Sequence, residues 1–252
     1  MMHTLRLKTI IISIFNRLGY RFFKPNPYSV FDFESFLERH LIVHKSLTFV
    51  QIGANDGIMN DPLYRFNQNH TAAVSGFVLE PLPDIFMNLV ENYRNCPKII
   101  PVNVAIHEEN SEMEIYRIKQ EHEKALPKFA RGIASFDPNH WEKTKLVPSA
   151  DYVQSEKVKC ISLKNFTRER EIHSLDLLLI DTEGHDYAIL KAIDFKVLKP
   201  KIIRFEHGVR DGLMSKNQFN EVCSILNSNG YQIVTESYDA TAYQLNSDDL
   251  VF

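Results

Sequence analysis

Two runs of ionisable residues follow strongly apolar segments of this sequence. The run Asp181–Asp186 comes directly after one such segment, and Glu206-His207 ends the next. Because the carboxyl ends of parallel strands meet at one edge of a sheet, we expect both runs to open into the same crevice. Histidine is suited to accept a proton near neutral pH, and a neighbouring carboxylate can orient it. The candidate catalytic residues are therefore Asp181, Glu183, His185, Glu206 and His207.

The same residues allow two other interpretations. Their oxygen and nitrogen atoms suit a divalent-metal site with mixed ligands. Acids and histidines at strand ends can also cap helices or pair with Arg204 or Arg210. We favour an active site without a metal, since structural acids are normally spread over solvated faces.

A short glycine-containing segment forms a second constellation. Gly53 and Gly57 bracket Ala-Asn-Asp after the first apolar segment, and Glu80 ends the next one. Glycines at such a turn let the backbone approach a ligand, and the acid is placed to bind two ribose hydroxyls. The pattern GxGxxG that cradles a pyrophosphate is absent, so we expect a nucleoside instead. The alternative is a tight turn followed by a surface acid.

Apolar strand-like segments alternate with helix-like ones after Leu47, which predicts an α/β fold. Such alternation is typical of a mostly parallel sheet with helices on both faces. Leu175–Asp181 is almost continuously apolar, as a central parallel strand should be. The predicted strands are Leu47–Ile52, Gly76–Glu80, Lys98–Val102, Leu175–Asp181, Lys201–Glu206, and a closing hairpin of Tyr231–Thr235 and Thr241–Leu245.

Three helices between these strands have recognisable sequence signals. Pro83 suits the first turn of a helix whose apolar face we place at Ile85, Phe86, Leu89, Val90 and Tyr93. A second helix runs through Ala188–Ile193. Ser215 and Gln218 have the spacing of a capping box, and Asn229-Gly230 ends the helix that they open.

Two segments lie outside this alternation. Residues 1–46 are expected to form an N-terminal helical extension, in which Phe31–Leu41 is the best helix. Residues 119–157 are a polar insertion between two strands, Met113–Ile118 and Lys157–Ile161. Long insertions of this kind are usually functional or disordered, so we expect an acceptor-binding lid within one domain spanning residues 47–252. Its candidate ligand contacts are Lys128, Arg131, Phe136, His140 and Trp141, with a local hydrophobic plug as the alternative for Trp141.

Composition and charge exclude several classes of protein. The chain has 252 residues, 44% of them hydrophobic, and a formal net charge of −3. These values argue against disorder in the bulk of the chain and against a nucleic-acid protein that relies on phosphate neutralisation. The cysteines, Cys96, Cys160 and Cys223, show no CxxC spacing, which favours structural thiols in a reducing, cytoplasmic compartment.

No segment is long enough to span a membrane. The longest early apolar run, Ile10–Phe15, is far shorter than the roughly 20 residues of a spanning helix. Basic residues surround it, so a peripheral contact with a membrane or a partner is one interpretation of this arm. A helix packed on the domain is the other, and we favour it.

Four motifs in order along the chain are familiar. Gly53–Gly57, Leu79-Glu-Pro81, Asn103–Ile106 and Asp181–Gly184 closely resemble those of the FkbM family of S-adenosylmethionine-dependent methyltransferases. The resemblance covers roughly residues 47–246. It implies a class I methyltransferase fold, a seven-stranded Rossmann-like sheet whose last strand is antiparallel. It also implies a cofactor, S-adenosylmethionine, and an acceptor hydroxyl on a sugar, glycan or secondary metabolite.

The resemblance assigns roles to particular positions. Gly53, Asn55, Asp56 and Gly57 match the loop beneath the methionine moiety, Glu80 with Pro81 the ribose site, and Asn103 the position beside the adenine; Asp181 and Glu183 lie next to the reacting centre. One departure is Gln51, which stands where an acid often precedes the glycine loop, so the resemblance does not assign how the methionine ammonium is held.

Methyl transfer requires a positioned acceptor and removal of its proton. General-base assistance typically contributes about 10²–10⁴-fold. We expect His185 or His207 to be the base, oriented by Asp181, Glu183 and Glu206. The competing interpretations are a non-catalytic metabolite-binding scaffold on the same fold, a metal-dependent hydrolase that uses Asp181–Asp186, and, ranked last, a nicotinamide oxidoreductase.

Overall fold

The computed structural model describes residues 31–127, 130, 133–145 and 147–244. The chain forms two compact units, Met1–Asp32 and Phe33–Phe252. Helix α2 (Phe33–His44) therefore belongs to the second unit, whereas it was predicted as part of the N-terminal extension. The basic arm predicted for the start of the chain lies outside the described residues.

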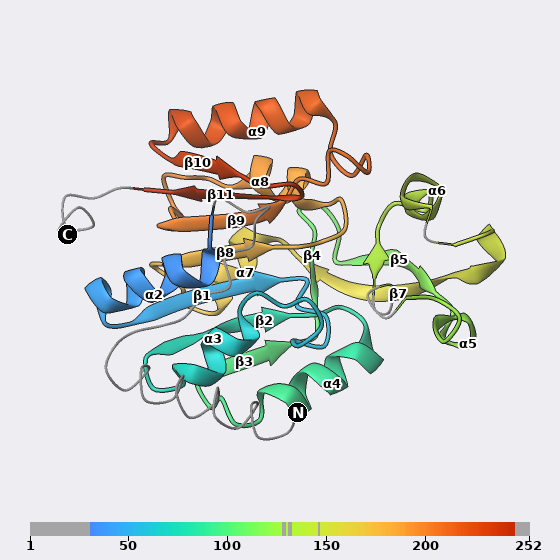
Figure 1. Cartoon of the computed structure of the whole chain (residues 1–252), viewed down its shortest axis with the longest axis horizontal. Coiled ribbons are helices and arrows are strands. Elements are labelled where there is room, and N and C mark those ends of the chain that lie inside the picture. The colour runs from blue at the N-terminus through green and yellow to red at the C-terminus, as the bar shows by residue number, and fades with distance from the viewer. Residues whose placement is uncertain (1–30, 128–129, 131–132, 146, 245–252) are drawn as a thin grey trace, which may run out of the picture. The chain divides into compact units, whose positions relative to one another are not determined.

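A seven-stranded sheet forms the centre of the second unit (Figure 1). Its order is β10-β11-β9-β8-β1-β2-β3, and β11 runs antiparallel to both of its neighbours while the other pairings are parallel. The predicted Rossmann-like sheet with an antiparallel last strand is thus confirmed. The strands are β1 (Leu47–Ile52), β2 (Val74–Leu79), β3 (Ile99–Val102), β8 (Leu177–Ile180), β9 (Ile202–Glu206), β10 (Gln232–Thr235) and β11 (Asp239–Tyr243).

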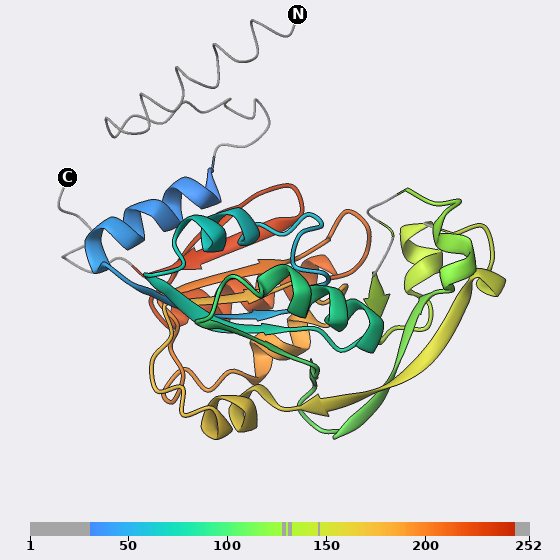
Figure 2. The ribbon, with the colours of Figure 1, turned by 90° about the horizontal axis from the view of Figure 1, so that it is seen from below.

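Helices cover both faces of this sheet (Figure 2). Helices α7 (Leu163–Glu169), α8 (Asp186–Ala192) and α9 (Lys216–Ser228) share one hydrophobic core with β1, β8 and β9. Helices α2, α3 (Tyr64–Asn69) and α4 (Pro83–Tyr93) lie on the opposite face. All four residues of β8 are buried because helices pack on both sides of this central strand.

Two of the predicted helix starts are present in the structure. Ser215 and Gln218 form a reciprocal capping box at the start of α9, as expected. Pro83 occupies the first turn of α4, and Leu89 and Tyr93 are buried on its inner face. Val90 is 40% exposed, so its place on that buried face is a wrong prediction.

The expected insertion contributes to a separate four-stranded sheet and is not a plain loop. Its order is β4-β7-β5-β6, with β5 and β7 paired antiparallel along their length. They correspond to the predicted strands Met113–Ile118 and Lys157–Ile161, and they pair with each other at the side of the unit (Figure 1). The elements are β4 (Ala105–Ile106), β5 (Glu112–Ile118), α5 (Gln120–Glu123), β6 (Ala134–Ser135), α6 (His140–Thr144), a 3-10 turn (Ala150–Tyr152) and β7 (Val153–Ile161).

The sheet of β4, β5, β6 and β7, which we call the side sheet, has a small core of its own. Trp141 is 3% exposed and packs with Ile118 and Ala130. Of the two interpretations of Trp141, the structure favours the local hydrophobic plug over the ligand contact, because this side chain is buried in the core of the insertion. His140 is buried beside it, whereas Lys128 and Arg131 lie outside the described residues. No helix in the described part of the chain is long and apolar enough to cross a membrane.

Candidate active site

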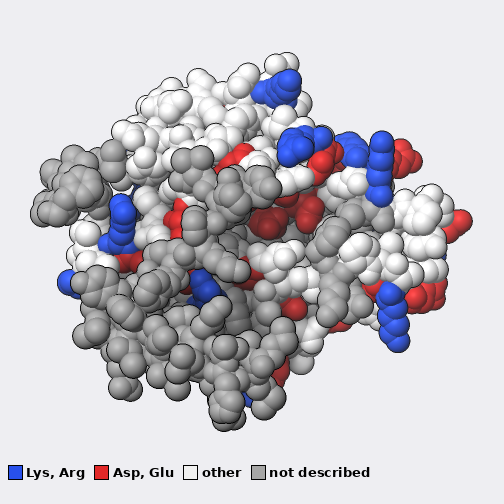
Figure 3. Space-filling view, viewed as in Figure 1, with Lys and Arg blue, Asp and Glu red and all other residues white. Residues whose placement is uncertain are grey.

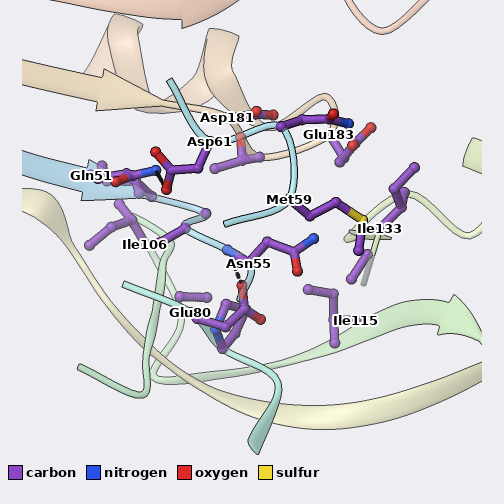
Figure 4. Close-up of a pocket in the computed structure, with 18 of the residues that line it drawn as sticks. Gln51, Asn55, Met59, Asp61, Glu80, Ile106, Ile115, Ile133, Asp181 and Glu183 are labelled. Atoms are coloured by element: carbon purple, nitrogen blue, oxygen red, sulfur yellow. Dashed lines mark hydrogen bonds between the residues drawn. The ribbon is translucent and has the colours of Figure 1, made fainter. Parts of the chain in front are cut away.

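A pocket lies at the carboxyl ends of β1, β2 and β8 (Figure 4). Its empty space is about 930 Å³, including the solvent at its mouth. The loop after β1 and the loop after β8 form two of its walls, and β4, β5 and β6 of the side sheet supply another. Among the predicted catalytic and cofactor-binding residues, those lining it are Gln51, Gly53, Asn55, Glu80, Pro81, Asp181 and Glu183.

Packing within the protein explains both glycines of the first loop. Gly53 has φ +78°, and a Cβ there would lie 1.8 Å from the Asp181 carbonyl oxygen. Gly57 has φ +75°, and a Cβ there would lie 2.5 Å from the ring of Tyr93 on α4. The first glycine thus lets the loops after β1 and β8 touch, which brings their side chains into one pocket.

Glu80 is almost fully buried at the end of β2. Its Oε2 accepts a hydrogen bond from the Asn55 backbone N–H (3.0 Å) and its Oε1 accepts one from the Leu82 N–H (2.9 Å). Burial raises the pKa of Glu80 to about 8. In the ionised form of Glu80, each oxygen can accept a second hydrogen bond, so two ligand hydroxyls can bind that form.

Two predicted cofactor contacts shape the loops and do not line the pocket. The Asn103 side-chain amide donates to the carbonyl oxygens of Glu80 (2.8 Å) and Pro81 (2.9 Å), which fixes the turn after β2. Asp56 Oδ1 accepts hydrogen bonds from the backbone N–H groups of Ile58 and Met59, both at 2.8 Å. Both residues therefore shape the pocket indirectly, because they fix the backbone of the loops that surround it.

The structure brings three of the predicted catalytic carboxylates together. One carboxylate oxygen from each of Asp181, Glu183 and Glu206 lies within 4.8 Å of the other two. Acidic side chains occupy a hollow on the face shown in Figure 3. Burial among protein atoms raises the pKa of Glu206, and neighbouring Asp181 raises it further. The Asp181 side chain faces the open space of the pocket. Desolvation by the surrounding protein raises the pKa of this carboxyl, and the charge of Glu183 raises it further.

The two predicted histidines lie outside this cluster and outside the pocket lining. His207 is 5% exposed, and its Nε2 contacts the Glu236 carbonyl oxygen (3.2 Å) while its Nδ1 accepts from the Val209 N–H (3.3 Å). The His185 ring stacks on His107 with 5.1 Å between ring centroids. Its Nε2 is buried with no hydrogen-bond partner among the described residues. The mixed metal site considered from the sequence thus reduces to three carboxylates in the described part of the chain.

Two acids outside the predicted catalytic and cofactor-binding residues organise the site: Asp186, which ends the ionisable run noted in the sequence, and Asp61, which was not singled out. Asp186 is buried, accepts from the Thr182 and Glu206 N–H groups, and so joins the ends of β8 and β9. Asp61 lines the pocket and accepts a hydrogen bond from the Gln51 side-chain amide (2.9 Å). The signal for Asp61 was available: Gln51 replaces an expected acid, and Asp61 lies in the loop that follows.

A second pocket adjoins the first at Glu183. Its walls are the α6 region of the insertion, with Asp137, His140 and Lys143, and the start of α9, with Ser215 and Lys216. His140 Nε2 lies 3.6 Å from Glu183 Oε2. The insertion also supplies Ile133, Ala134 and Phe136 to the first pocket, so it contributes to both.

Comparison with protein families finds one match. The model of the methyltransferase FkbM domain matches residues 51–233. No curated protein matches the chain.

Similar solved structures include a putative O-methyltransferase from Klebsiella pneumoniae, with 11% identity over 94% of this chain and 89% of that one (TM-score 0.45). An O-methyltransferase from Bacillus cereus in complex with SAH has 8% identity over 86% and 84% (TM-score 0.44). Cofactor-bound Rv0187 from MTB has 9% identity over 86% and 82% (TM-score 0.46). All three TM-scores are below 0.5, so the fold assignment rests on this chain's own strand order.

Proposed function

Because the chain belongs to the FkbM methyltransferase family, we propose that it transfers a methyl group from S-adenosylmethionine to a hydroxyl oxygen of a sugar, glycan or secondary metabolite. The observation that carries the proposal is the first pocket, in which Glu80 lies on the side opposite Asp181 and Glu183, two members of the carboxylate cluster (Figure 4). A cofactor that lies between them would have its nucleoside near Glu80 and its reactive end near the cluster.

The residues of the pocket fit this cofactor. Glu80 retains two accepting positions for ribose hydroxyls. The apolar side chains of Ile106, Ile115 and Ile133 provide surface for a flat base and a thioether chain. When bound, S-adenosylmethionine supplies an electrophilic methyl group, and the protein must position the acceptor and take its proton.

We assign the proton acceptor to the carboxylate cluster in place of His185 or His207. Glu183 lines both pockets, so it lies where an acceptor hydroxyl can meet the cofactor. Burial raises the pKa of Glu183, and the charge of Asp186 raises it further. Carboxyls this close share protons, so one of the three can stay ionised as a base while a neighbour holds a proton.

The second pocket is the acceptor site in this proposal. Polar groups of α6 and of the start of α9 line it, which suits a ligand rich in hydroxyls. The insertion of residues 119–157 then acts as the acceptor-binding lid, as its sequence suggested. Because Ile133 and Phe136 also line the first pocket, deleting the insertion should weaken both acceptor and cofactor binding.

The transfer reaction tests the proposal. The purified protein is incubated with S-adenosylmethionine and a panel of sugars, glycans and polyhydroxylated metabolites, and release of S-adenosylhomocysteine is measured. The position of the new methyl group is then assigned by NMR. A methoxy product supports the proposal, whereas methylation on nitrogen or carbon would contradict it.

A substitution at Glu183 tests the assignment of the base. Glu183→Gln should lower kcat by about 10²–10⁴-fold, because an amide accepts no proton at neutral pH. Binding of S-adenosylhomocysteine should change less than about 3-fold. Glu221→Gln, on the outer surface of α9 beside Lys191, is the matched control and should leave both values unchanged. An unchanged kcat in Glu183→Gln would sink the assignment.

Proton sharing also predicts how the enzyme responds to a chelator. If a shared proton neutralises the cluster, EDTA should leave kcat within about 2-fold of its value in chelator-free buffer. Loss of activity in EDTA that Mg²⁺ restores would show that a cation takes the place of the shared proton.

A further inference from the structure

The first pocket holds a buried polar atom that the protein leaves without a partner. The Gln51 side chain is 2% exposed, and its Nε2 donates to Asp61 Oδ2 at 2.9 Å. A carboxylate only accepts hydrogen bonds, so this contact fixes the orientation of the amide. Gln51 Oε1 is then a buried acceptor with no hydrogen-bond partner among the described residues. Such an atom needs a donor from a ligand or from water, and without one it incurs a desolvation cost of about 1–3 kcal/mol.

Asp61 places a carboxylate beside this acceptor. Its Oδ1 accepts from the Leu63 N–H (2.6 Å) and the Tyr64 N–H (3.0 Å), which anchors the side chain at the start of α3. Its Oδ2 accepts from Gln51 and has room for a second donor. Within the described part of the chain, none of the ion pairs involves Asp61.

The acidic residues of the pocket favour a cation there, because a bound positive charge favours the ionised form of nearby acids. Its described lining residues include four carboxylates, Asp61, Glu80, Asp181 and Glu183, and neither Lys nor Arg. Figure 4 shows Asp61 on the side of the pocket opposite Glu80. An acceptor amide oxygen next to a carboxylate with a free position suits a group that carries positive charge and several N–H donors, and a primary ammonium has three.

We propose that Gln51 and Asp61 together bind the α-ammonium group of the amino-acid moiety of S-adenosylmethionine. The inference rests on the proposed function and names the residues for one end of that ligand. The ammonium donates one hydrogen bond to Gln51 Oε1 and one to Asp61 Oδ2. Asp61 thereby supplies the charge that Gln51, at the end of β1, lacks. A sulfonium group has no N–H, so it would leave Gln51 Oε1 unsatisfied.

Two ligands that differ only at this end provide the test. S-adenosylhomocysteine carries the amino-acid moiety, and 5′-methylthioadenosine shares the adenosine and thioether but lacks it. Asp61→Asn removes the charge and keeps an oxygen to cap Leu63 and Tyr64. By calorimetry, Asp61→Asn should weaken S-adenosylhomocysteine binding about 10–100-fold, as expected for a charge-assisted hydrogen bond, and change 5′-methylthioadenosine binding less than about 3-fold.

A rescue variant and a control keep the test decisive. Gln51→Glu combined with Asp61→Asn moves the carboxylate to the neighbouring position and should recover at least 5-fold of the lost affinity for S-adenosylhomocysteine. Asp194→Asn, another carboxylate that caps a backbone N–H, lies outside both pockets and should change neither affinity.

Three outcomes would overturn the inference. Equal weakening of both ligands in Asp61→Asn would place the effect at the nucleoside or in the fold, and no weakening of either would place the ammonium elsewhere. Failure of the wild type to bind S-adenosylhomocysteine at all would reject the proposed function as well. The first two results leave the proposed function standing, so the two failures are distinguishable.

Discussion

At the scale of single residues, the shape of the pocket depends on loop conformations that only particular residues allow. Gly53 lets the loop after β1 lie against the Asp181 carbonyl. Glu80 in turn accepts the Asn55 N–H and holds the other end of that loop. The residues that bind ligand and those that shape the loop are therefore close neighbours, and a change in the second group moves the first.

Gly53→Ala should destabilise the protein much more than a glycine substitution without a nearby neighbour. The added Cβ would lie 1.8 Å from the Asp181 oxygen, so the two loops must separate. Gly230→Ala is the matched control, because Gly230 also has positive φ (+86°) but its Cβ would meet nothing within 4 Å. Positive φ alone costs roughly 1–2 kcal/mol. Thermal unfolding should show a clearly larger loss of Tm for Gly53→Ala; equal losses would contradict this packing argument.

Residue types predicted the position of the pocket better than the role of each member. Gln51, Gly53, Asn55, Glu80, Asp181 and Glu183 line it as expected. His207 was a plausible base by type, but its ring nitrogens contact backbone at Glu236 and Val209. Such contacts depend on how the chain folds back over β9, and no local pattern in the sequence encodes them.

At the scale of elements, a buried arginine connects the side sheet to helix α4, which packs on the seven-stranded sheet. Arg117 of β5 is 2% exposed, and its guanidinium donates to both carboxylate oxygens of Asp84 at the start of α4 (2.6 and 3.0 Å). Glu156 of β7 lies 3.5 Å from the same group. This contact holds the sheet that supplies one wall of the pocket.

Arg117→Met should therefore loosen the side sheet. Removing one partner of a buried pair typically costs about 3–5 kcal/mol, and the partly exposed Asp84 places this case near the lower end. We expect a lower midpoint in guanidinium unfolding and faster proteolysis within residues 119–157. Lys157→Met removes an exposed pair with Glu112 on the same two strands and should cost no more than about 1 kcal/mol. Similar losses for both variants would show that burial of Arg117 contributes nothing.

The alternation of strands and helices made the central sheet predictable, and the side sheet was not. β1 agrees with its predicted bounds, and β8 and β9 differ only at their ends. Met113–Ile118 and Lys157–Ile161 were recognised as strands, but their pairing spans the insertion between them. A sequence pattern shows that a segment is extended, and does not show which distant segment it pairs with.

At the scale of the whole molecule, buried acids make stability depend on pH. Burial raises the pKa of Glu80 to about 8 and that of Asp61 to about 6. The folded protein therefore binds more protons than the unfolded chain above pH of about 4.5, and this contribution to stability falls as pH rises through the raised pKa. Burial lowers the pKa of His140 and His185 to about 4, so their contribution rises with pH between about 4 and 6.5.

The two effects separate above a pH of about 7.5, where the histidines are almost entirely neutral in both states. The Tm should therefore fall between a pH of about 7.5 and about 8.5. Glu80→Gln should flatten this slope, because the group no longer titrates. A Tm that rises across this interval in the wild type would contradict the assignment of buried, protonated acids.

The central claim is that the pocket at the ends of β1, β2 and β8 binds the nucleoside of S-adenosylmethionine. The most direct measurement is calorimetric titration of the wild type, Glu80→Gln and the surface control Glu91→Gln with S-adenosylhomocysteine, after thermal unfolding has confirmed that each variant is folded. We predict one site per chain in the wild type and the control. Glu80→Gln should bind about 10–100-fold more weakly, because an amide cannot accept from both backbone N–H groups and both ribose hydroxyls. No binding to the wild type, or equal binding to Glu80→Gln, would contradict the claim.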